Sequence, residues 1–409
     1  MSVMDGWELD GAKGKDKSSS HRDFSTMIRP LMWFGVLIGV IPCTAHRLPD
    51  GEAEEGKPRV TYSFSVVSFP SFITVVWWFT TVLYALTVPF DDPFLGKEHY
   101  SFLAILNYIV GFIYVINYVP VWIILWRAAR LTSLFNAVAE LDAALPSRSL
   151  KTCLTIAVSI TSYATAITMS CLFEKFVDGQ KNIIPRVTVF VHVSYAGPTY
   201  VMLMWTLAVH LAQKFEVLNT QVEEAVKWKN AAKLSHLRHL HYKLRSVVKE
   251  VDAVFYPVTG PSYIRMIVMM CMQLTLVDTY SNMDYSPQYF WIFVVMNCGY
   301  MINIMMVHAL PDLCAGKAAS TVHLLEAHDP EDDAFSKQVS RWRAELASTR
   351  VYITASGLVE LNMPGLWTDA QFMITIYVVL VQFTRDSALV NDQPPLWLSQ
   401  LLNSSKYLQ

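Results

Sequence analysis

Seven long apolar segments, separated by polar sequence, constrain the fold of this chain more than any other feature. They are Val67–Phe90, Phe102–Trp126, Thr152–Phe173, Val187–Ala212, Ser262–Tyr280, Tyr289–Leu310 and Asp369–Thr384. Most of them reach the ~20 residues that an α-helix needs to cross a bilayer. Only 16% of the 409 residues are charged, against about 25% in soluble domains. The sequence therefore predicts an all-α polytopic membrane protein with seven transmembrane helices.

A shorter apolar run, Leu31–Ala45, precedes these segments and contains Pro42. Its fifteen residues leave two alternatives: a membrane span, or a helix that lies at the membrane interface or dips into it. The distribution of positive charge favours the second, because a span here would place the basic N-terminal tail and the other basic loops on opposite sides. We therefore expect a short, non-spanning N-terminal membrane helix.

Lysine and arginine residues predict the orientation of the seven spans. With the N-terminus inside and the C-terminus outside, 25 of the 32 basic residues fall in inner segments and 6 in outer segments. This orientation is opposite to that of G-protein-coupled receptors, and no DRY or NPxxY sequence stands at the corresponding span ends. The outer tail also contains one glycosylation sequon, at Asn403.

Two long inner segments carry apolar residues at helical spacing among charged ones. In the first they are Leu234, Leu237, Leu240, Leu244, Val247, Val248 and Val251, and in the second Val339, Trp342, Leu346, Val351 and Leu358. We expect these segments to pack together as a cytosolic anchor, and the fourth span to continue into it through Lys214–Asn219. The predicted boundaries are 1–28 disordered cytosolic tail, 29–66 interfacial helix and linker, 67–213 spans one to four, 214–261 cytosolic helical anchor, 262–310 spans five and six, 311–368 cytosolic helical loop, 369–385 pore-lining last span and 386–409 extracellular tail.

The last apolar segment differs from the others, because its uninterrupted apolar run is short and contains polar groups. Thr375 and Gln382 are seven residues apart, which places them on one face of a helix with Val378 and Val379 between them. A polar–apolar–polar stripe of this kind is what a channel needs to admit water to its pore and to close it by dewetting. The alternative is an ordinary polar contact between helices.

The same segment resembles the last helix of the gustatory receptors of insects and other arthropods. That helix is written Thr-Tyr, five apolar residues, then Gln-Phe; here Thr375, Gln382 and Phe383 are in register, while Ile376 replaces the Tyr. The segment Thr354–Leu358 is similar to the sequence that leads into that helix. The resemblance implies four subunits, as a homo- or heterotetramer with related receptors, around a pore lined by the last helix. It also implies a ligand pocket in each subunit that opens outward. The expected pore residues are Thr375, Val378, Val379, Gln382 and Phe383.

The outer halves of the spans carry the candidate ligand-binding residues. They are Trp78, Asn107, Tyr108, His192, Tyr195, Asp278, Trp291 and Asn297. Aromatic faces with a few hydrogen-bonding groups suit small tastants, either sugars or bitter compounds. The alternative for the aromatic residues is the interfacial belt that any membrane protein has. His192 has the alternative of a satisfied contact between helices, and Asp278 that of a carboxylate that reaches toward water.

Composition and motifs argue against several other classes of function. A net charge of −2 offers no basic field for nucleic acid, and none of the six cysteines has CxxC spacing. His236, His239 and His241 lie close together in sequence, but no cysteine or carboxylate completes a metal-ligand pattern. No enzyme motif appears, so we expect no catalysis, no metal and no cofactor.

These observations leave three hypotheses. The first is a ligand-gated, non-selective cation channel that acts as a taste chemoreceptor in the cell membrane, in contact with membrane lipid and located in the dendrite of a sensory neuron. The second is a metabotropic seven-span receptor, which the predicted orientation disfavours. The third is a transporter or a structural membrane protein. Current recorded in excised patches without GTP would separate the first from the other two.

Overall fold

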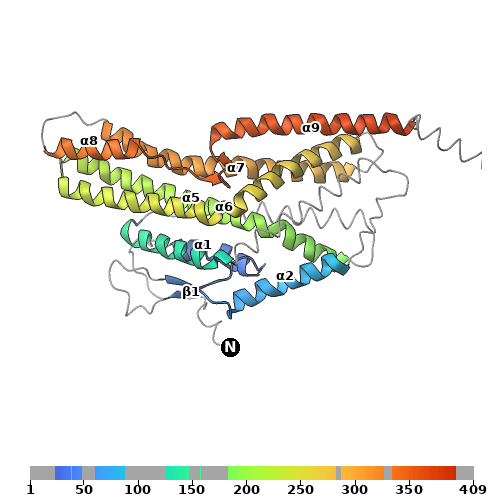
Figure 1. Cartoon of the computed structure of the whole chain (residues 1–409), viewed down its shortest axis with the longest axis horizontal. Helices are drawn as coiled ribbons and strands as arrows, with labels where there is room; N and C mark the ends of the chain where they lie inside the picture. Colours follow the sequence, from blue (N-terminus) through green and yellow to red (C-terminus); the bar gives the residue numbers. More distant parts are fainter. Residues whose placement is uncertain are drawn as a thin grey trace, which may run out of the picture.

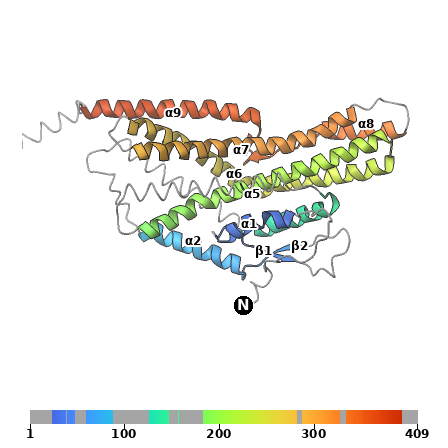
Figure 2. The ribbon, with the colours of Figure 1, turned by 180° about the vertical axis from the view of Figure 1, so that it is seen from behind.

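A computed structural model of the chain describes residues 24–37, 39–47, 60–87, 126–146, 157, 183–281, 287–326 and 334–392. Three long helices form its centre: α5 (Ile183–Lys227), α6 (Ala231–Ser281) and α7 (Pro287–Glu326). Toward the α8 end they run side by side, and α5 contacts both of the others; toward the other end the first part of α5 diverges from α6 and α7 and approaches α2 (Figures 1 and 2). At one end of the bundle lies α8 (Ala334–Ala347), and toward the other end α9 (Met363–Asp392) lies against α6 and α7.

Each of the three central helices joins a predicted span to a predicted inner segment. In α5 the helix continues through Lys214–Asn219, as expected from the sequence, and ends at Lys227. In α6 the amphipathic segment and the fifth span form one continuous helix of 51 residues. All seven apolar residues predicted for its packed face, from Leu234 to Val251, are buried. Burial of this stripe explains why the charged half of α6 is helical, since packing of an apolar face stabilises most protein helices.

Helix α8 completes this part of the molecule, which we call the anchor bundle: α5 from residue 213, α6 to residue 261, α7 from residue 311, and α8. Val339, Trp342 and Leu346 of α8 are buried, as their spacing predicts. Leu358 does not belong to this face, since it lies beyond the helix in a tight turn and is 74% exposed. The expectation for Leu358 was wrong because the chain leaves helical geometry after Ala347.

The N-terminal apolar run differs from the expected helix in its second half. Helix α1 (Phe24–Leu37) begins inside the predicted disordered tail, and its buried residues Phe24, Ile28 and Leu31 lie on one face. The chain then turns at Gly39, whose positive φ of 69° suits glycine. Strand β1 (Cys43–Arg47) follows and pairs antiparallel with β2 (Val60–Phe64). The prediction of one helix over Leu31–Ala45 is therefore wrong beyond Leu37.

The elements before α5 lie on the side of α5 that faces away from α9 (Figure 1). Helix α2 (Phe69–Thr87) covers most of the predicted first span and contacts α1 and α5. A further helix over residues 126–144 begins at the end of the predicted second span. It buries six apolar side chains, namely Ala128, Leu131, Leu134, Phe135, Val138 and Leu141. The rest of the second span and, apart from residue 157, the third span lie outside the described residues.

A short antiparallel hairpin, β3 (Thr354–Ala355) and β4 (Val359–Glu360), connects α8 to α9. Helix α9 is 30 residues long. It begins before the predicted span Asp369–Thr384 and ends after it, so it includes the start of the predicted tail. It begins where the Asn362 side chain accepts a hydrogen bond from the Gly365 backbone nitrogen at 2.8 Å, in the manner of an N-cap.

Length and composition identify one helical stretch among the described residues, Thr199–Lys227, that is long and apolar enough to cross a membrane. A shorter apolar helix, Met27–Leu37, falls below that length.

Candidate functional site

The two faces of α9 have different surroundings. On one face Asp369 and Met373 are buried, and Leu366, Ala370 and Ile376 pack against the hydrophobic core. On the other face Phe372, Val378 and Val379 are between 41% and 55% exposed in the single chain. One face of α9 therefore packs against α6 and α7. The opposite face, which we call the free face, is not buried by any described part of the chain.

The residues predicted to line a pore lie mostly on this free face. Thr375, Val379 and Gln382 are all exposed, and their spacings of four and three place them in one stripe. The hydroxyl of Thr375 donates a hydrogen bond to the backbone oxygen of Gln371 at 2.9 Å. Phe383 lies on α9, but its side chain is outside the described residues. The structure therefore places Thr375, Val379 and Gln382 together on one face of α9.

The β3–β4 hairpin attaches the start of α9 to the middle of α6. One carboxylate oxygen of Asp252 accepts hydrogen bonds from both the backbone nitrogen and the hydroxyl of Thr354, at 2.7 and 2.9 Å. Thr259 donates to the backbone oxygen of Thr354 at 3.2 Å. These contacts give the segment Thr354–Leu358, recognised in the sequence by resemblance, a structural role.

The two prolines of α6 explain why other segments can bind its backbone here. A proline has no N–H, so the carbonyl four residues earlier loses its helical partner. For Pro257 this carbonyl belongs to Ala253, and the Arg127 guanidinium donates to it at 2.7 Å. Between the prolines, the Ser356 hydroxyl accepts from the Gly260 backbone nitrogen at 2.9 Å and donates to the Tyr256 backbone oxygen. That nitrogen and oxygen are partners in a regular α-helix, so Ser356 is inserted into the hydrogen-bond pattern of α6.

A buried histidine of α7, His308, contacts α6 and the first turns of α9. The ring of His308 lies 2.6 Å from Asp369 through Nε2 and 2.8 Å from the backbone oxygen of Asn362 through Nδ1. The hydroxyl of Tyr263 is 3.3 Å from Nε2. The sulfur of Cys271 then contacts the backbone oxygen of Met373 at 3.6 Å. Sequence reasoning did not single out His308, because nothing local distinguishes it from other polar residues in apolar segments.

A second buried polar cluster joins α1, the helix over residues 126–144 and α5. The Asp142 carboxylate accepts from the Phe24 backbone nitrogen at 2.7 Å, and contacts Nε2 of His210 at 2.8 Å and Nζ of Lys214 at 2.5 Å. Burial alone would raise the pKa of Asp142, but the contacts with His210 and Lys214 hold it at about 2. Asp142 is therefore ionised at neutral pH and balances the charge of Lys214, whose side chain is only 2% exposed.

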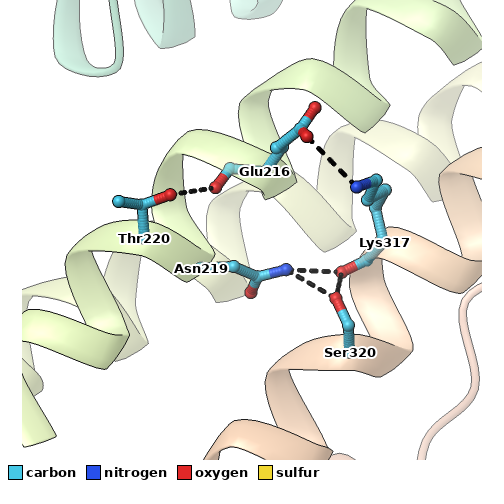
Figure 3. A network of polar contacts seen from close by, with 5 residues as sticks. All are labelled: Glu216, Asn219, Thr220, Lys317 and Ser320. Atoms are coloured by element: carbon cyan, nitrogen blue, oxygen red, sulfur yellow. Dashed lines mark hydrogen bonds and ion pairs between the residues drawn. The ribbon is translucent and has the colours of Figure 1, made fainter.

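The anchor bundle contains a polar hollow between α5 and α7, shown in part in Figure 3. Asn219 donates to the backbone oxygen of Lys317 at 2.8 Å and to the Ser320 hydroxyl at 2.7 Å, while Lys317 pairs with Glu216 at 3.2 Å. The hollow has a volume of about 390 Å³ and is lined by Glu216, Asn219, Thr220, Glu223, Lys317, Ser320, His323 and Leu324. The contacts of Asn219 with Ser320 and of Glu216 with Lys317 link α5 to α7, which suits a contact between helices.

One of the three histidines noted in the sequence of α6 is buried in the anchor bundle. His241 packs between the rings of Phe215 and Trp342, with centroid distances of 5.4 and 5.9 Å. Burial and the nearby charge of Arg245 lower its pKa to about 4, so the ring is neutral at pH 7. Its environment is that of a packed aromatic side chain.

The predicted ligand-binding residues are only partly placed. Trp78 lies on α2, His192 and Tyr195 on α5, Asp278 on α6, and Trp291 and Asn297 on α7, but their side chains are outside what the structure describes. Asn107, Tyr108 and the sequon residue Asn403 lie outside the described residues altogether. The outward-facing pocket expected from the sequence therefore stays a prediction.

Comparison with known proteins relates this arrangement to one family. The sequence model of the 7tm chemosensory receptor family matches residues 28–385. Two structures of the olfactory receptor OR5 from Machilis hrabei, one of them in complex with eugenol, have a similar fold. Each has 14% sequence identity and a TM-score of 0.65, and the match covers 87% of this chain and 97% of the receptor. No curated protein matches the chain by sequence. The match to the family model over most of its length shows that the chain belongs to the 7tm chemosensory receptor family.

Proposed function

We propose that the chain is a subunit of a ligand-gated, non-selective cation channel that acts as a taste chemoreceptor. A small tastant, either a sugar or a bitter compound, binds in an outward-facing pocket and opens a pore lined by α9. The observation that carries this proposal is the free face of α9, on which Thr375, Val379 and Gln382 form one exposed stripe while Met373 and Ile376 pack on the other side.

The chemistry of that face favours a wet surface over a lipid-facing one. A glutamine amide has donors and acceptors that hydrocarbon cannot satisfy, so such side chains in membrane helices usually face other protein groups or water. One helix cannot enclose a water path, whereas copies related by closed rotational symmetry can. A tetramer of this chain, alone or with related receptors, would place four Gln382 amides and four Val379 side chains around one axis.

The ring of Val379 is the proposed constriction. A narrow apolar ring excludes water until it widens, so a small outward movement of α9 would hydrate it. Ligand binding needs to favour the open state by only about 2–3 kcal/mol to shift the populations by tens of fold or more. The carbonyls at the end of the pore and the Gln382 amides would favour cations.

The orientation of the subunit follows from its basic residues. The N-terminus and the anchor bundle lie in the cytosol, where 25 of the 32 lysine and arginine residues fall, and the C-terminus lies outside. The protein spans the membrane of a sensory neuron's dendrite seven times. The related receptor solved with eugenol supports a small organic molecule as the ligand class, although the fold alone is shared at this level of identity.

Recording from excised, inside-out patches of cells that express the chain tests the proposal. A panel of sugars, bitter compounds and eugenol is applied through the pipette, with no GTP in the bath. We expect a ligand-evoked current. Gln382→Ala should alter the ion selectivity of this current, whereas Ile376→Val, on the packed face of α9, should not. Saturable uptake without conductance would instead identify a transporter, and a response that needs GTP would identify a metabotropic receptor.

A further inference from the structure

The start of α9 is held by a contact whose geometry requires a proton. The His308 side chain is fully buried between α6, α7 and α9, and the Asp369 side chain is 9% exposed. Nδ1 of His308 faces the backbone oxygen of Asn362 at 2.8 Å, and Nε2 faces Oδ2 of Asp369 at 2.6 Å. Both ring nitrogens therefore point at oxygen atoms of acceptor groups.

The number of protons follows from the roles of these atoms. A backbone oxygen only accepts, so Nδ1 of His308 carries a hydrogen. If Nε2 carried none and Asp369 were a carboxylate, two lone pairs would face each other at 2.6 Å. One shared proton removes this repulsion, whether the pair is written as imidazolium and carboxylate or as imidazole and carboxylic acid. Separately in water above pH 7, the two groups would be a neutral imidazole and a carboxylate, which hold one proton fewer.

The other titratable groups that face the ring do not supply this proton at neutral pH. Tyr263 approaches Nε2 from α6 at 3.3 Å, and its hydroxyl can donate a hydrogen bond but ordinarily ionises only near pH 10. Asp312, one turn further along α7, places a second negative charge near the ring.

We propose that this shared proton ties the start of α9 to α6 and α7, so that cytosolic alkalinisation uncouples α9 from the rest of the subunit. This inference rests on the proposed channel function. The tie lies where α9 is packed, at Asp369 and Met373, whereas the proposed pore residues Thr375, Val379 and Gln382 lie beyond it. Movement of α7, which carries the candidate ligand residues Trp291 and Asn297, reaches α9 through His308.

Thermal unfolding of the purified protein tests the tie without any need for current. With the proposed shared proton, the folded state holds one proton more than the unfolded state above pH 7, so the wild-type melting temperature should fall as pH rises from 7 to 9. In Asp369→Asn, the amide can donate to a neutral Nε2 and no proton is required, so this fall is reduced. Asp369→Ala, which removes the contact, should have a low melting temperature and the same reduced fall. The control Glu224→Gln, at an exposed ion pair of the anchor bundle, should keep the wild-type fall. Equal falls in wild type and Asp369→Asn would overturn the proposal.

Patch recording then tests the consequence for gating. With bath pH raised from 7 to 9 at the cytosolic face, the equilibrium between tied and untied α9 shifts by up to about tenfold per pH unit, the limit for one proton. Ligand-evoked current of the wild type falls accordingly, and that of Asp369→Asn does not. If both currents fall equally, the tie is not the pH-sensitive element, although the channel proposal stands. If no variant conducts but the melting temperatures differ as expected, the tie stands and the channel proposal fails.

Discussion

The Ser356 hydroxyl lies 2.9 Å from the backbone nitrogen of Gly260, so the turn that precedes α9 touches the backbone of α6 directly. A Cβ atom at position 260 would stand 2.6 Å from the Cβ of Ser356, closer than such atoms approach. The hairpin reaches α6 only because residue 260 has no side chain. This contact and the Asp252–Thr354 hydrogen bonds attach the β3–β4 hairpin to α6 at two adjacent points.

Replacing this glycine should therefore displace the hairpin. Gly260→Ala is expected to cost about 1–3 kcal/mol of stability, the usual range for overpacking. The matched control is Gly316→Ala in α7, where a Cβ would meet nothing within 4 Å, so the gain in helix propensity of roughly 0.5–1 kcal/mol should dominate. Thermal unfolding in detergent measures both. Equal effects of the two substitutions would contradict the role given to Gly260.

The buried ion pair of Asp142 with Lys214 predicts a large loss on truncation. Asp142→Ala leaves the Lys214 ammonium buried without its carboxylate, a change that typically costs about 3–5 kcal/mol. Glu224 pairs with Lys233 at a similar distance of 2.9 Å, but both side chains are exposed. Glu224→Gln should therefore change stability by less than about 1 kcal/mol. Comparable losses in the two variants would show that burial does not strengthen the Asp142 pair.

The pH dependence of this pair has a defined sign. The pKa of Asp142 lies at about 2 in the folded protein, below its ordinary value of 3.8. A depressed carboxyl pKa gives stability that is present above the ordinary value and is lost as pH falls toward the folded value. Acid titration of the wild type between pH 5 and 2 should show a loss that Asp142→Asn lacks. A wild-type protein whose stability is flat in this window would contradict the assignment.

The parts of the fold that the sequence predicts are those specified by local periodicity. The stripe from Leu234 to Val251 repeats at helical spacing, and its burial follows from a pattern that any amphipathic helix shows. The hairpin after α1 was missed because an apolar composition outweighed the turn signals of Gly39 and Pro42. Periodicity alone does not distinguish a short buried strand from a helix.

The candidate site was less predictable, because its contacts join residues far apart in the chain. Ser356 meets Gly260 and His308 meets Asp369 across different helices, and no local spacing indicates either pair. The prolines of α6 were a usable signal: each leaves a backbone oxygen without its helical partner, and such a group calls for a donor from elsewhere. For Ala253 that donor is Arg127.

The orientation in the membrane can be tested with epitope tags in intact cells. We expect an N-terminal tag to be stained only after permeabilisation and a C-terminal tag to be stained without it, because basic residues are concentrated in the proposed cytosolic segments. Staining of the N-terminal tag in intact cells would reverse the orientation. It would also move the anchor bundle and the Asp369 contact to the outside.

Glycosylation of Asn403 offers a second, independent test of sidedness. The sequon Asn403-Ser404-Ser405 lies in the proposed extracellular tail, where the glycosylation machinery can reach it. Treatment with a glycosidase should shift the wild-type protein on a gel and leave Asn403→Gln unshifted. A glycan retained by Asn403→Gln would mean that another asparagine is modified.

The sharpest prediction concerns the free face of α9. Val379→Ser should raise the current recorded without ligand, because a hydroxyl lets water into a ring that excludes it when apolar. Gln382→Ala should change conductance or ion selectivity more than it changes the half-maximal ligand concentration. Ile376, which packs against the core, supplies the control position: Ile376→Val should leave the unliganded current unchanged.

Thiol modification distinguishes the proposed face from its opposite. Cysteines placed at positions 375, 379 and 382 should react with a water-soluble reagent when ligand is present, since the proposed open pore brings water to these residues. Cysteines at positions 376 and 383 should stay unmodified, because residue 376 packs inward and residue 383 is turned about 100° from Gln382. The reverse pattern would mean that lipid or a neighbouring helix covers the exposed stripe, and that water reaches the face which packs on α6 and α7 in the single chain.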